Sequence, residues 1–254
     1  MKKYAKEFKE SSAPQRSPQW YKERAGIPSS SGLAFLFDVL RDGYTPSAKA
    51  KNYLKQLAYE RKFGVTYDVF VTKPMADGVF FEDFAKMVYQ RDTGNKLEVS
   101  NSFISPWFVS TPDAKVYEKS KKPNIIAGGL EARRHTIGVG GLECKIVGDK
   151  TFLELMQEGM PIEHERQTQS QMMATGWDWV DYIVVNLKTK HYFIQRVHRN
   201  NALIKRIYER LHEPLNLPEL KDVGVKRFDD GMLEDWMTGN NVKPSDLEVL
   251  DLPF

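Results

Sequence analysis

Cysteine is nearly absent from this chain, which contains a single one, Cys144. One thiol excludes an intramolecular disulfide and a zinc or iron–sulfur site built from cysteines, so a metal must be held mainly by oxygen ligands. Oxygen ligands favour Mg²⁺, with Mn²⁺ as the alternative. Long apolar runs are also missing, and the N-terminus has no apolar stretch typical of a signal peptide. We therefore expect a cytoplasmic protein without a membrane partner.

The composition is that of an ordinary globular protein with a mild positive charge. The chain has 254 residues, of which 41% are hydrophobic and 28% charged, and its mean hydropathy is −0.51. This length suffices for one sizeable core. The net charge of +3 is concentrated in basic clusters at 115–122, 133–134 and 196–210. Such clusters suit a polyanion such as DNA, although a solvated lysine-rich surface gives the same pattern.

The order of helical and strand patterns predicts an α/β (α+β) protein with one small mixed β-sheet flanked by helices. The expected helices, from apolar spacing and capping residues, span 19–26, 31–41, 46–63, 77–92, 149–157, 163–175 and 200–212. The expected strands, from β-branched and aromatic runs, lie within 102–116, 135–147, 179–187 and 191–197. The domain would cover 17–212, between an N-terminal extension, 1–16, and a C-terminal extension with an acidic tail, 213–254.

Two short motifs on neighbouring predicted strands combine an aspartate with a Glu-x-Lys. Thr111-Pro112-Asp113 is followed, about thirty residues later, by Glu143-Cys144-Lys145. On adjacent strands, Asp113 and Glu143 can hold a hard cation, and Lys145 lies beside the water that the cation activates. Cys144 then faces the opposite side of the sheet, so we expect a core residue rather than a nucleophile. The motifs indicate a metal-dependent phosphodiester hydrolase, but ordinary strand charges also fit strings this short.

Three further segments carry residues suited to DNA chemistry. Arg24 precedes the serines of 29–31, and a guanidinium with hydroxyls at a helix start suits a phosphate. Glu82 interrupts an apolar helix stripe, where a carboxylate needs a cation or metal nearby unless it faces solvent. Gln167 and Gln171 are spaced to share one helix face, which is either part of a site or a polar surface.

Taken in chain order, these segments resemble the lambda-type exonucleases, also called YqaJ-like viral recombinase nucleases. That family has the restriction-endonuclease-like fold, whose signature is Pro-Asp followed by Asp/Glu-x-Lys. The similarity runs from about Gln15 to His212. It rests on five segments, which are Ser17 to Ser31, Gly78 to Gly94 with its Glu82-Asp-Phe-Ala85, Pro112-Asp113, Glu143-Cys-Lys145, and His164 to Gly176 with its Gln167-Thr-Gln169.

The resemblance implies a role for each matched residue. The implied catalytic residues are Asp113, Glu143, Lys145, Glu82 and Gln167. The implied Mg²⁺ ligands are Asp113, Glu143 and the backbone carbonyl of Cys144, with Lys145 orienting the attacking water or stabilising the developing charge. The residues implied to bind the terminal 5′-phosphate of the digested strand are Arg24, Ser29, Ser31 and Thr111.

The implied activity is 5′→3′ degradation of one strand of linear double-stranded DNA to 5′-mononucleotides. The 3′ overhangs left behind would serve a single-strand annealing protein in phage-type recombination. The family also implies a ring-shaped homotrimer, a phage or prophage origin, and hence the cytoplasm of a bacterial host. One alternative is a structure-specific endonuclease or Cas4-like nuclease of the same fold, although a single cysteine argues against the iron–sulfur cluster of the latter. A non-catalytic DNA-binding or assembly protein is an alternative of another class.

The sequence departs from the family pattern at several positions. Ala114 replaces the usual glycine after the aspartate, Lys145 lacks the Cys-Pro that often follows, and His164 stands in place of a tyrosine. The connection between the two motifs is longer and more basic than the family's usual turn, so it is open whether residues 114–142 touch DNA, a partner or neither. The acidic end, 246–254, is similar to the partner-recruiting tip of bacterial single-strand DNA-binding proteins, although short acidic ends are common.

Overall fold

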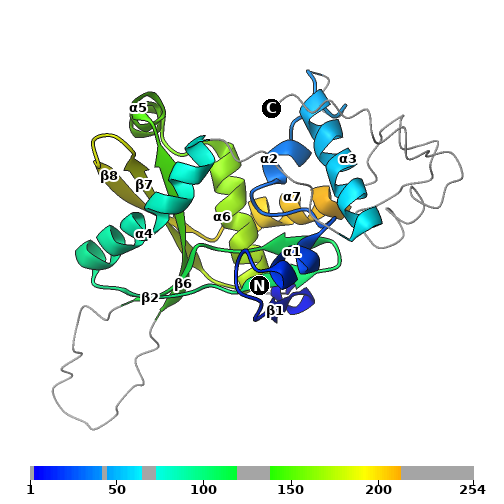
Figure 1. The fold of residues 1–254 in the computed structure, drawn as a ribbon, viewed down its shortest axis with the longest axis horizontal. Coiled ribbons are helices and arrows are strands. Elements are labelled where there is room, and N and C mark those ends of the chain that lie inside the picture. The colour runs from blue at the N-terminus through cyan, green and yellow to red at the C-terminus, as the bar shows by residue number, and fades with distance from the viewer. Residues whose placement is uncertain (1–2, 42–44, 65–72, 119–137, 213–254) are drawn as a thin grey trace, which may run out of the picture.

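The structure, a computed structural model, describes residues 3–41, 45–64, 73–118 and 138–212. Most of the basic connection, 119–137, and the acidic C-terminal extension, 213–254, lie outside the described residues. The elements, labelled in Figure 1, are in chain order η1 (Tyr4–Glu7), β1 (Lys9–Ser11), α1 (Pro18–Arg24), α2 (Leu33–Leu36), α3 (Ala48–Phe63), α4 (Lys73–Thr93), β2 (Lys96–Glu98), β3 (Ser102–Ser105), β4 (Phe108–Ser110), β5 (Ala114–Tyr117), β6 (Val139–Val147), α5 (Asp149–Glu158), α6 (Ile162–Thr175), β7 (Trp179–Asn186), β8 (Tyr192–His198) and α7 (Asn201–His212).

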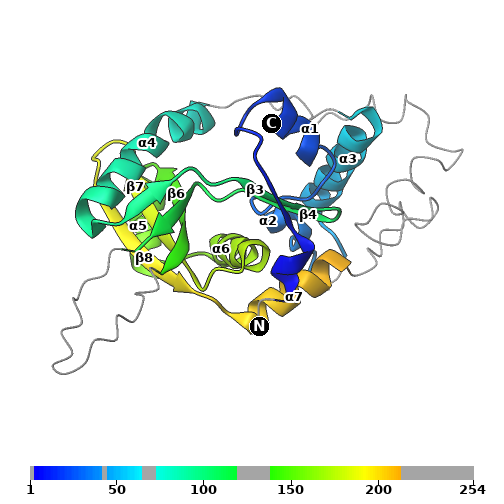
Figure 2. The ribbon, with the colours of Figure 1, turned by 90° about the horizontal axis from the view of Figure 1, so that it is seen from below.

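The main sheet is mixed and has the strand order β2-β5-β6-β7-β8. Strands β6 and β7 run parallel, because the chain between them returns to the same end of the sheet through α5 and α6. The other three strand pairs are antiparallel. The predicted α/β class, with a mixed sheet flanked by helices, is confirmed. The prediction of one sheet was incomplete, because β1, β3 and β4 form a second, three-stranded antiparallel sheet. Figure 2 shows α6 almost end-on between the two sheets.

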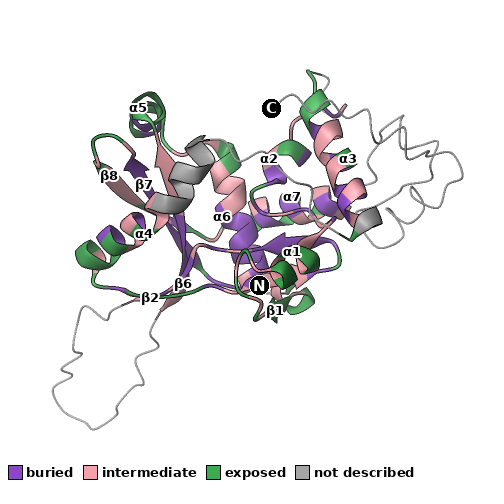
Figure 3. Ribbon diagram, in the orientation of Figure 1, coloured by how far each residue is buried: buried purple, intermediate pink, exposed green. Residues whose placement is uncertain are grey.

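The core lies on both faces of the main sheet, and β7 divides it. All eight residues of β7 are buried, and alternate side chains enter different apolar clusters, as strand geometry requires. One cluster includes Val180, Tyr182 and Val184 with residues of α5 and α6, whereas the other includes Trp179, Ile183 and Val185 with residues of α4. The buried stretches of β7 and α6 stand out in Figure 3. The main sheet is therefore a rigid support covered by helices on both sides.

Helix boundaries follow local capping residues where the sequence supplies them. The side-chain oxygen of Ser17 accepts from the Trp20 N–H at the start of α1, and that of Ser47 accepts from the Ala50 N–H at the start of α3. Gly64 ends α3 in the left-handed region, at φ 63°. The predicted helices over 19–26, 46–63, 149–157, 163–175 and 200–212 are confirmed to within a few residues.

Two predicted elements were wrong in extent, and two strands were missed. The helix expected over 31–41 is only α2, because the chain turns back after it: the Ser47 N–H donates to the Asp38 carbonyl, and Val39 forms a bridge with Pro46. The helix expected over 77–92 begins earlier, at Lys73. The missed strands, β1 and β2, have only three residues each, too few for a recognisable alternation.

The N-terminal segment is tied to the body of the protein. β1 pairs with β3, and the buried Tyr4 ring stacks on Tyr208 of α7 with 4.3 Å between ring centroids. The polar residues before α1 thus lie against the surface through sheet pairing and an aromatic stack.

Gly140 in β6 allows a tryptophan to lie directly on the strand. A Cβ atom at this position would lie 2.4 Å from ring carbons of Trp179.

We predict that Gly140→Ala lowers the free energy of unfolding by about 1–3 kcal/mol, because the ring must move from a packed position. Urea unfolding measures this. Gly148→Ala is the control, since no atom lies within 4 Å of its Cβ position and its φ is −79°, and it should change stability by less than about 0.5 kcal/mol. Equal stability of the two variants would contradict the packing argument.

Candidate active site

Asp113 stands where the pairing between β5 and β6 stops. Ala114 pairs with Leu142, and the Asp113 N–H donates to the Leu142 carbonyl at 3.1 Å. Past this point, the Cys144 N–H donates to the side chain of Asp113, at 2.6 Å from Oδ2, instead of to a residue of β5. Glu143-Cys144-Lys145 thus lies on β6, as predicted, whereas Thr111-Pro112-Asp113 lies immediately before the adjacent strand β5 rather than on it.

Cys144 directs its backbone and its side chain to different places. In an antiparallel ladder the N–H and C=O of one residue face the same edge, so the Cys144 carbonyl lies on the Asp113 side. Its side chain packs in the apolar cluster that α4 covers. Burial, reinforced by the negative charges of Asp113 and Glu143, raises the pKa of the thiol well above its ordinary value. A thiol held protonated in this way is a poor nucleophile, in keeping with the expected core role.

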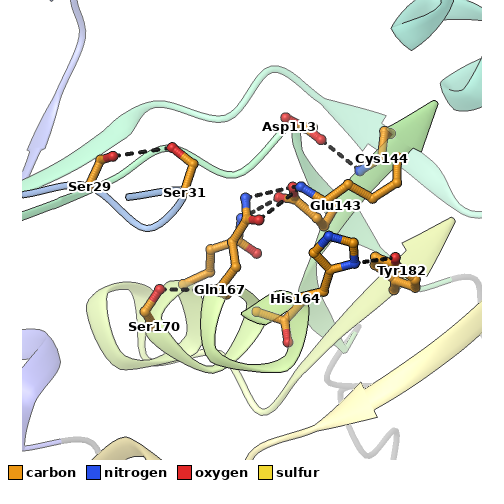
Figure 4. Close-up of polar contacts among 12 residues, drawn as sticks. Ser29, Ser31, Asp113, Glu143, Cys144, His164, Gln167, Ser170 and Tyr182 are labelled. Carbon is orange, nitrogen blue, oxygen red and sulfur yellow. Dashed lines mark hydrogen bonds and ion pairs between the residues drawn. The ribbon is translucent and has the colours of Figure 1, made fainter. Parts of the chain in front are cut away.

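Glu143 is a buried carboxylate, 3% exposed, that accepts hydrogen bonds from three side chains. Its Oε1 accepts from Gln167 Nε2 and Lys145 Nζ, both at 2.7 Å, and its Oε2 accepts from Gln171 Nε2 at 2.5 Å. In Figure 4, Gln167 rises from α6 toward Glu143. A buried carboxylate is tolerated when such donors replace water. The two glutamines and the lysine therefore fix the orientation of this carboxylate.

Lys145 connects Glu143 to Gln167 of α6 through hydrogen bonds. Besides Glu143, its ammonium donates to Gln167 Oε1 at 2.8 Å. Burial lowers the pKa of Lys145, but the charge and hydrogen bond of Glu143 outweigh it, so the pKa lies above its ordinary value. Lys145 is thus a fixed positive charge beside the carboxylates.

Glu82 lies at the cavity wall and is held by two cations. Its oxygens contact Lys86 Nζ at 2.5 Å, one helical turn away on α4, and Arg16 Nη2 at 3.3 Å. The sequence predicted a cation or a metal near this carboxylate. The structure places two cationic side chains there, Lys86 and Arg16. Lys86 was not among the predicted site residues, although its spacing from Glu82 is the usual one for a helix ion pair.

The carboxyl of Asp113 lies in an environment that disfavours its ionised form. Desolvation, and then the negative charges of Glu143 and Glu82, raise the pKa of its carboxyl well above the ordinary value. The Cys144 N–H and the Lys145 charge only partly oppose this rise. Asp113 is thus a desolvated carboxyl next to two other carboxylates, with no cationic side chain paired to it among the described residues, and a divalent cation would relieve this condition.

One cavity of about 470 Å³ joins these residues to the predicted phosphate-binding residues. Its wall contains all of the predicted side chains: Glu82, Asp113, Glu143, Lys145, Gln167, Arg24, Ser29, Ser31 and Thr111. Residues far apart in sequence are thus brought to a single space. The sequence did not predict that Gln15, Arg16, Trp20 and Ile146 also line it.

Arg24 is positioned by an aromatic ring. Its guanidinium lies 4.0 Å from the centroid of the Trp20 ring, and Trp20 Nε1 donates to Ser102 Oγ at 2.9 Å. Burial lowers the pKa of Arg24, partly offset by the neighbouring Glu60 and tyrosines. Figure 4 shows the hydroxyls of Ser29 and Ser31 facing each other, 3.2 Å apart. A rigid guanidinium and two hydroxyls in one cavity form a suitable anion site.

His164 and Gln171 are the residues whose place the sequence left unsettled. His164 Nδ1 and the Tyr182 hydroxyl lie 2.7 Å apart, and Tyr182 pairs with Glu143 across β6 and β7. Burial and the nearby Lys145 lower the pKa of His164. Gln171 was recognised as sharing a face with Gln167, and that spacing was the signal for its contact with Glu143. Gln169 faces elsewhere and binds the His198 carbonyl.

The donor set of the site fits a hard divalent cation. Asp113 and Glu143 supply carboxylate oxygens, and the Cys144 carbonyl lies on the same side. Among the described residues, no group of three or more His, Cys, Asp or Glu side chains is arranged to hold a metal. Remaining ligands would therefore have to come from the carbonyl, water or substrate, an arrangement typical of Mg²⁺.

A helix-covered mixed sheet with Asp113 before one strand and Glu143 and Lys145 on the next defines a nuclease of the restriction-endonuclease-like class. The chain belongs to the family of the YqaJ-like viral recombinase domain, whose family model matches residues 19–178. This assignment confirms the resemblance inferred from the sequence motifs and the expectation of an enzyme. No curated protein sequence matches the chain.

Solved structures of two exonucleases share the fold. The alkaline exonuclease from Laribacter hongkongensis is 24% identical, with a TM-score of 0.60 over 76% of this chain and 88% of that one. Its complex with dAMP gives a TM-score of 0.61 at the same identity and coverage. A phage-related exonuclease from Haemophilus somnus is 14% identical, with a TM-score of 0.50 over 72% of this chain and 89% of that one.

In the described residues, no helix is both long and apolar enough to cross a membrane.

The raised pKa of Asp113 predicts a stability gain for the neutral variant. The unfolded chain ionises this carboxyl near pH 4, whereas the folded metal-free protein holds the proton to higher pH. Asp113 therefore costs stability as the pH rises from about 4 towards its folded pKa. In chelator at pH 7, Asp113→Asn should unfold with at least about 1 kcal/mol more free energy than the parent, and the difference should shrink as the pH falls to about 4.

Urea unfolding over this pH range measures the difference. Asp149→Asn, at an exposed position that begins α5, is the control and should show no such pH-dependent gain. A variant at position 113 that is less stable than the parent at pH 7 would contradict the account of Asp113.

Proposed function

We propose that the protein is a Mg²⁺-dependent 5′→3′ exonuclease that degrades one strand of linear double-stranded DNA to 5′-mononucleotides. The observation that carries the proposal is the single cavity, which joins Asp113, Glu143 and Lys145 to Arg24 and its neighbouring serines. Hydrolytic groups and an anion site in one space of this size suit a strand end whose terminal phosphate is held while the next bond is cut. An endonuclease has no need of such a terminal pocket.

One group of residues binds the terminal phosphate of the DNA strand, and a second group positions protons and charge at the reacting phosphate. Arg24, on the Trp20 ring, gives two parallel hydrogen bonds to a terminal phosphate, and the hydroxyls of Ser29 and Ser31 add donors. Thr111, bonded to Ser102 Oγ at 2.7 Å, contributes a further hydroxyl at the cavity wall. These contacts determine which phosphodiester bond reaches the carboxylates.

In the other part of the cavity, around Asp113 and Glu143, the side chains support the attack of water on that bond. Mg²⁺ bound by Asp113, Glu143 and the Cys144 carbonyl would lower the pKa of a coordinated water and offset phosphate charge, and Mn²⁺ would fit the same oxygens. Lys145 holds a proton on Nζ beside Glu143, where it orients water or stabilises negative charge on the reacting phosphate. Gln167 fixes the positions of Lys145 and Glu143 relative to each other, because it accepts a hydrogen bond from Lys145 and donates one to Glu143. Glu82 adds negative charge near Asp113.

Further parts of the proposal rest on the family alone. They are a homotrimeric ring, a single-strand annealing protein that receives the 3′ overhang, and a domain spanning 17–212 with extensions on either side. The dAMP complex of the Laribacter hongkongensis exonuclease supports mononucleotides as the product class.

The test of the proposal uses linear duplex labelled at one 5′ end and, separately, at one 3′ end. With Mg²⁺, the parent should release 5′ label as mononucleotide at once, whereas the 3′-labelled strand should shorten progressively and lose its label only at the end. Asp113→Asn should lose at least about 100-fold in rate, and Asp149→Asn should match the parent. Equal rates for Asp113→Asn and the parent would refute the site, and Mg²⁺-dependent nicking of closed circular duplex would favour an endonuclease.

Arg24 gives a separate prediction about the strand end. Arg24→Ala should slow digestion of 5′-phosphorylated duplex about 10–100-fold, because a charge-assisted bidentate contact is lost, and should change digestion of 5′-hydroxyl ends much less. Initial rates on the two substrates measure the effect. Lys22→Ala, which removes an exposed charge from the same helix, should leave both rates unchanged. Equal losses on both substrates would assign Arg24 to folding rather than to phosphate binding.

A further inference from the structure

Arg166 lies on α6, the helix that carries Gln167, and none of the described carboxylates forms an ion pair with it. Its Nε atom is buried and has no hydrogen-bond partner. Within the described part of the chain, no hydrogen bond or ion pair holds the rest of the guanidinium either. Burial lowers the pKa of Arg166, and the nearest charges opposing this are Glu163 and Glu165 on the same helix. A partly desolvated guanidinium of this kind is compensated when an anion binds to it.

The guanidinium is nevertheless held in a defined place. Its central carbon lies 4.2 Å from the centroid of the Phe37 ring, and Phe37 packs against the main apolar cluster. Stacking on a fixed ring orients the guanidinium plane without using any of its N–H donors. Arg24 on Trp20 shows the same arrangement inside the cavity.

The position of Arg166 relates it to both parts of the cavity. Its Cα lies about 3.8 Å from that of Gln167, and successive helix residues point about 100° apart, so Arg166 faces α2 while Gln167 faces β6. Phe37 immediately follows α2, which in turn follows Ser29 and Ser31. Arg166 does not line the cavity itself. Its guanidinium therefore lies outside the cavity, next to elements that form its wall.

We propose that Arg166, stacked on Phe37, binds a backbone phosphate of the DNA substrate outside the cavity. This inference rests on the proposed function and names a DNA contact beyond the terminal and reacting phosphates. Each DNA strand carries a phosphate about every 3.4 Å along the duplex axis, so a strand that enters the cavity places its neighbouring phosphates outside. The free N–H donors of Arg166 suit one of these.

The test measures binding rather than cleavage. Fluorescence anisotropy with a 5′-phosphorylated duplex, in chelator and over a series of salt concentrations, gives the affinity and its salt dependence. Arg166→Met keeps an unbranched stem on Phe37 and removes the charge. This variant should bind about tenfold more weakly, and its log–log salt slope should be about 0.9 smaller than that of the parent. Arg166→Lys should keep the parent's slope, because one charge remains.

Controls separate a phosphate contact from a structural role. Lys150→Met removes an exposed charge of α5 and should change binding less than twofold. Arg166→Met should unfold at the parent's temperature or above, because a buried unpaired N–H is removed. An unchanged salt slope, or an Arg166→Met protein that is destabilised or fails to fold, would overturn the proposal. If the parent neither binds nor degrades duplex, the proposed function itself fails; if it does both and Arg166→Met binds alike, only the role of Arg166 fails.

Discussion

The end of the ladder between β5 and β6, at Ala114 and Leu142, determines where the acidic groups of the protein meet. If the ladder continued, Cys144 would lie opposite Pro112, whose carbonyl could accept from the Cys144 N–H but which has no N–H to donate to the Cys144 carbonyl. Because β5 begins at Ala114, the carboxylate of Asp113 takes the N–H instead, and the carbonyl stays on the same side. Strand alternation then turns Glu143 and Lys145 toward α6. A single choice of register thus places two carboxylates, a carbonyl and an ammonium around one space.

Two neutral amides make this arrangement tolerable. Glu143 is buried, and Gln167 and Gln171 on α6 satisfy its oxygens together with Lys145. Asp113 receives less compensation, so desolvation and the neighbouring carboxylates raise the pKa of its carboxyl well above the ordinary value. The site is therefore a strained acidic cluster held by a rigid helix and sheet, which is the form expected of a cation-binding centre. Two arginines stacked on aromatic rings lie farther from the carboxylates, Arg24 on Trp20 within the cavity and Arg166 on Phe37 outside it.

Much of the fold could be predicted because its signals are local. Ser17, Ser47 and Gly64 begin or end helices through contacts within a few residues, and the sequence shows them directly. The short α2 could not be predicted, because its end depends on the pairing of Val39 with Pro46. The strands β1 and β2 exist only because β3 and β5 supply their hydrogen-bond partners. For the same reason the second sheet was missed.

The sequence by itself determined the chemical inventory: carboxylates and a single thiol, a Pro-Asp with a Glu-x-Lys, and an arginine followed by serines. It also determined the family, since these motifs occur in a recognisable order. Only the tertiary structure decided that Arg24 and Glu143 line the same cavity, that Gln171 reaches Glu143, and that Arg166 makes no hydrogen bond or ion pair with the described residues. Motif order depends on residues close in the chain, whereas a shared cavity and an unpaired charge depend on which distant segments pack together.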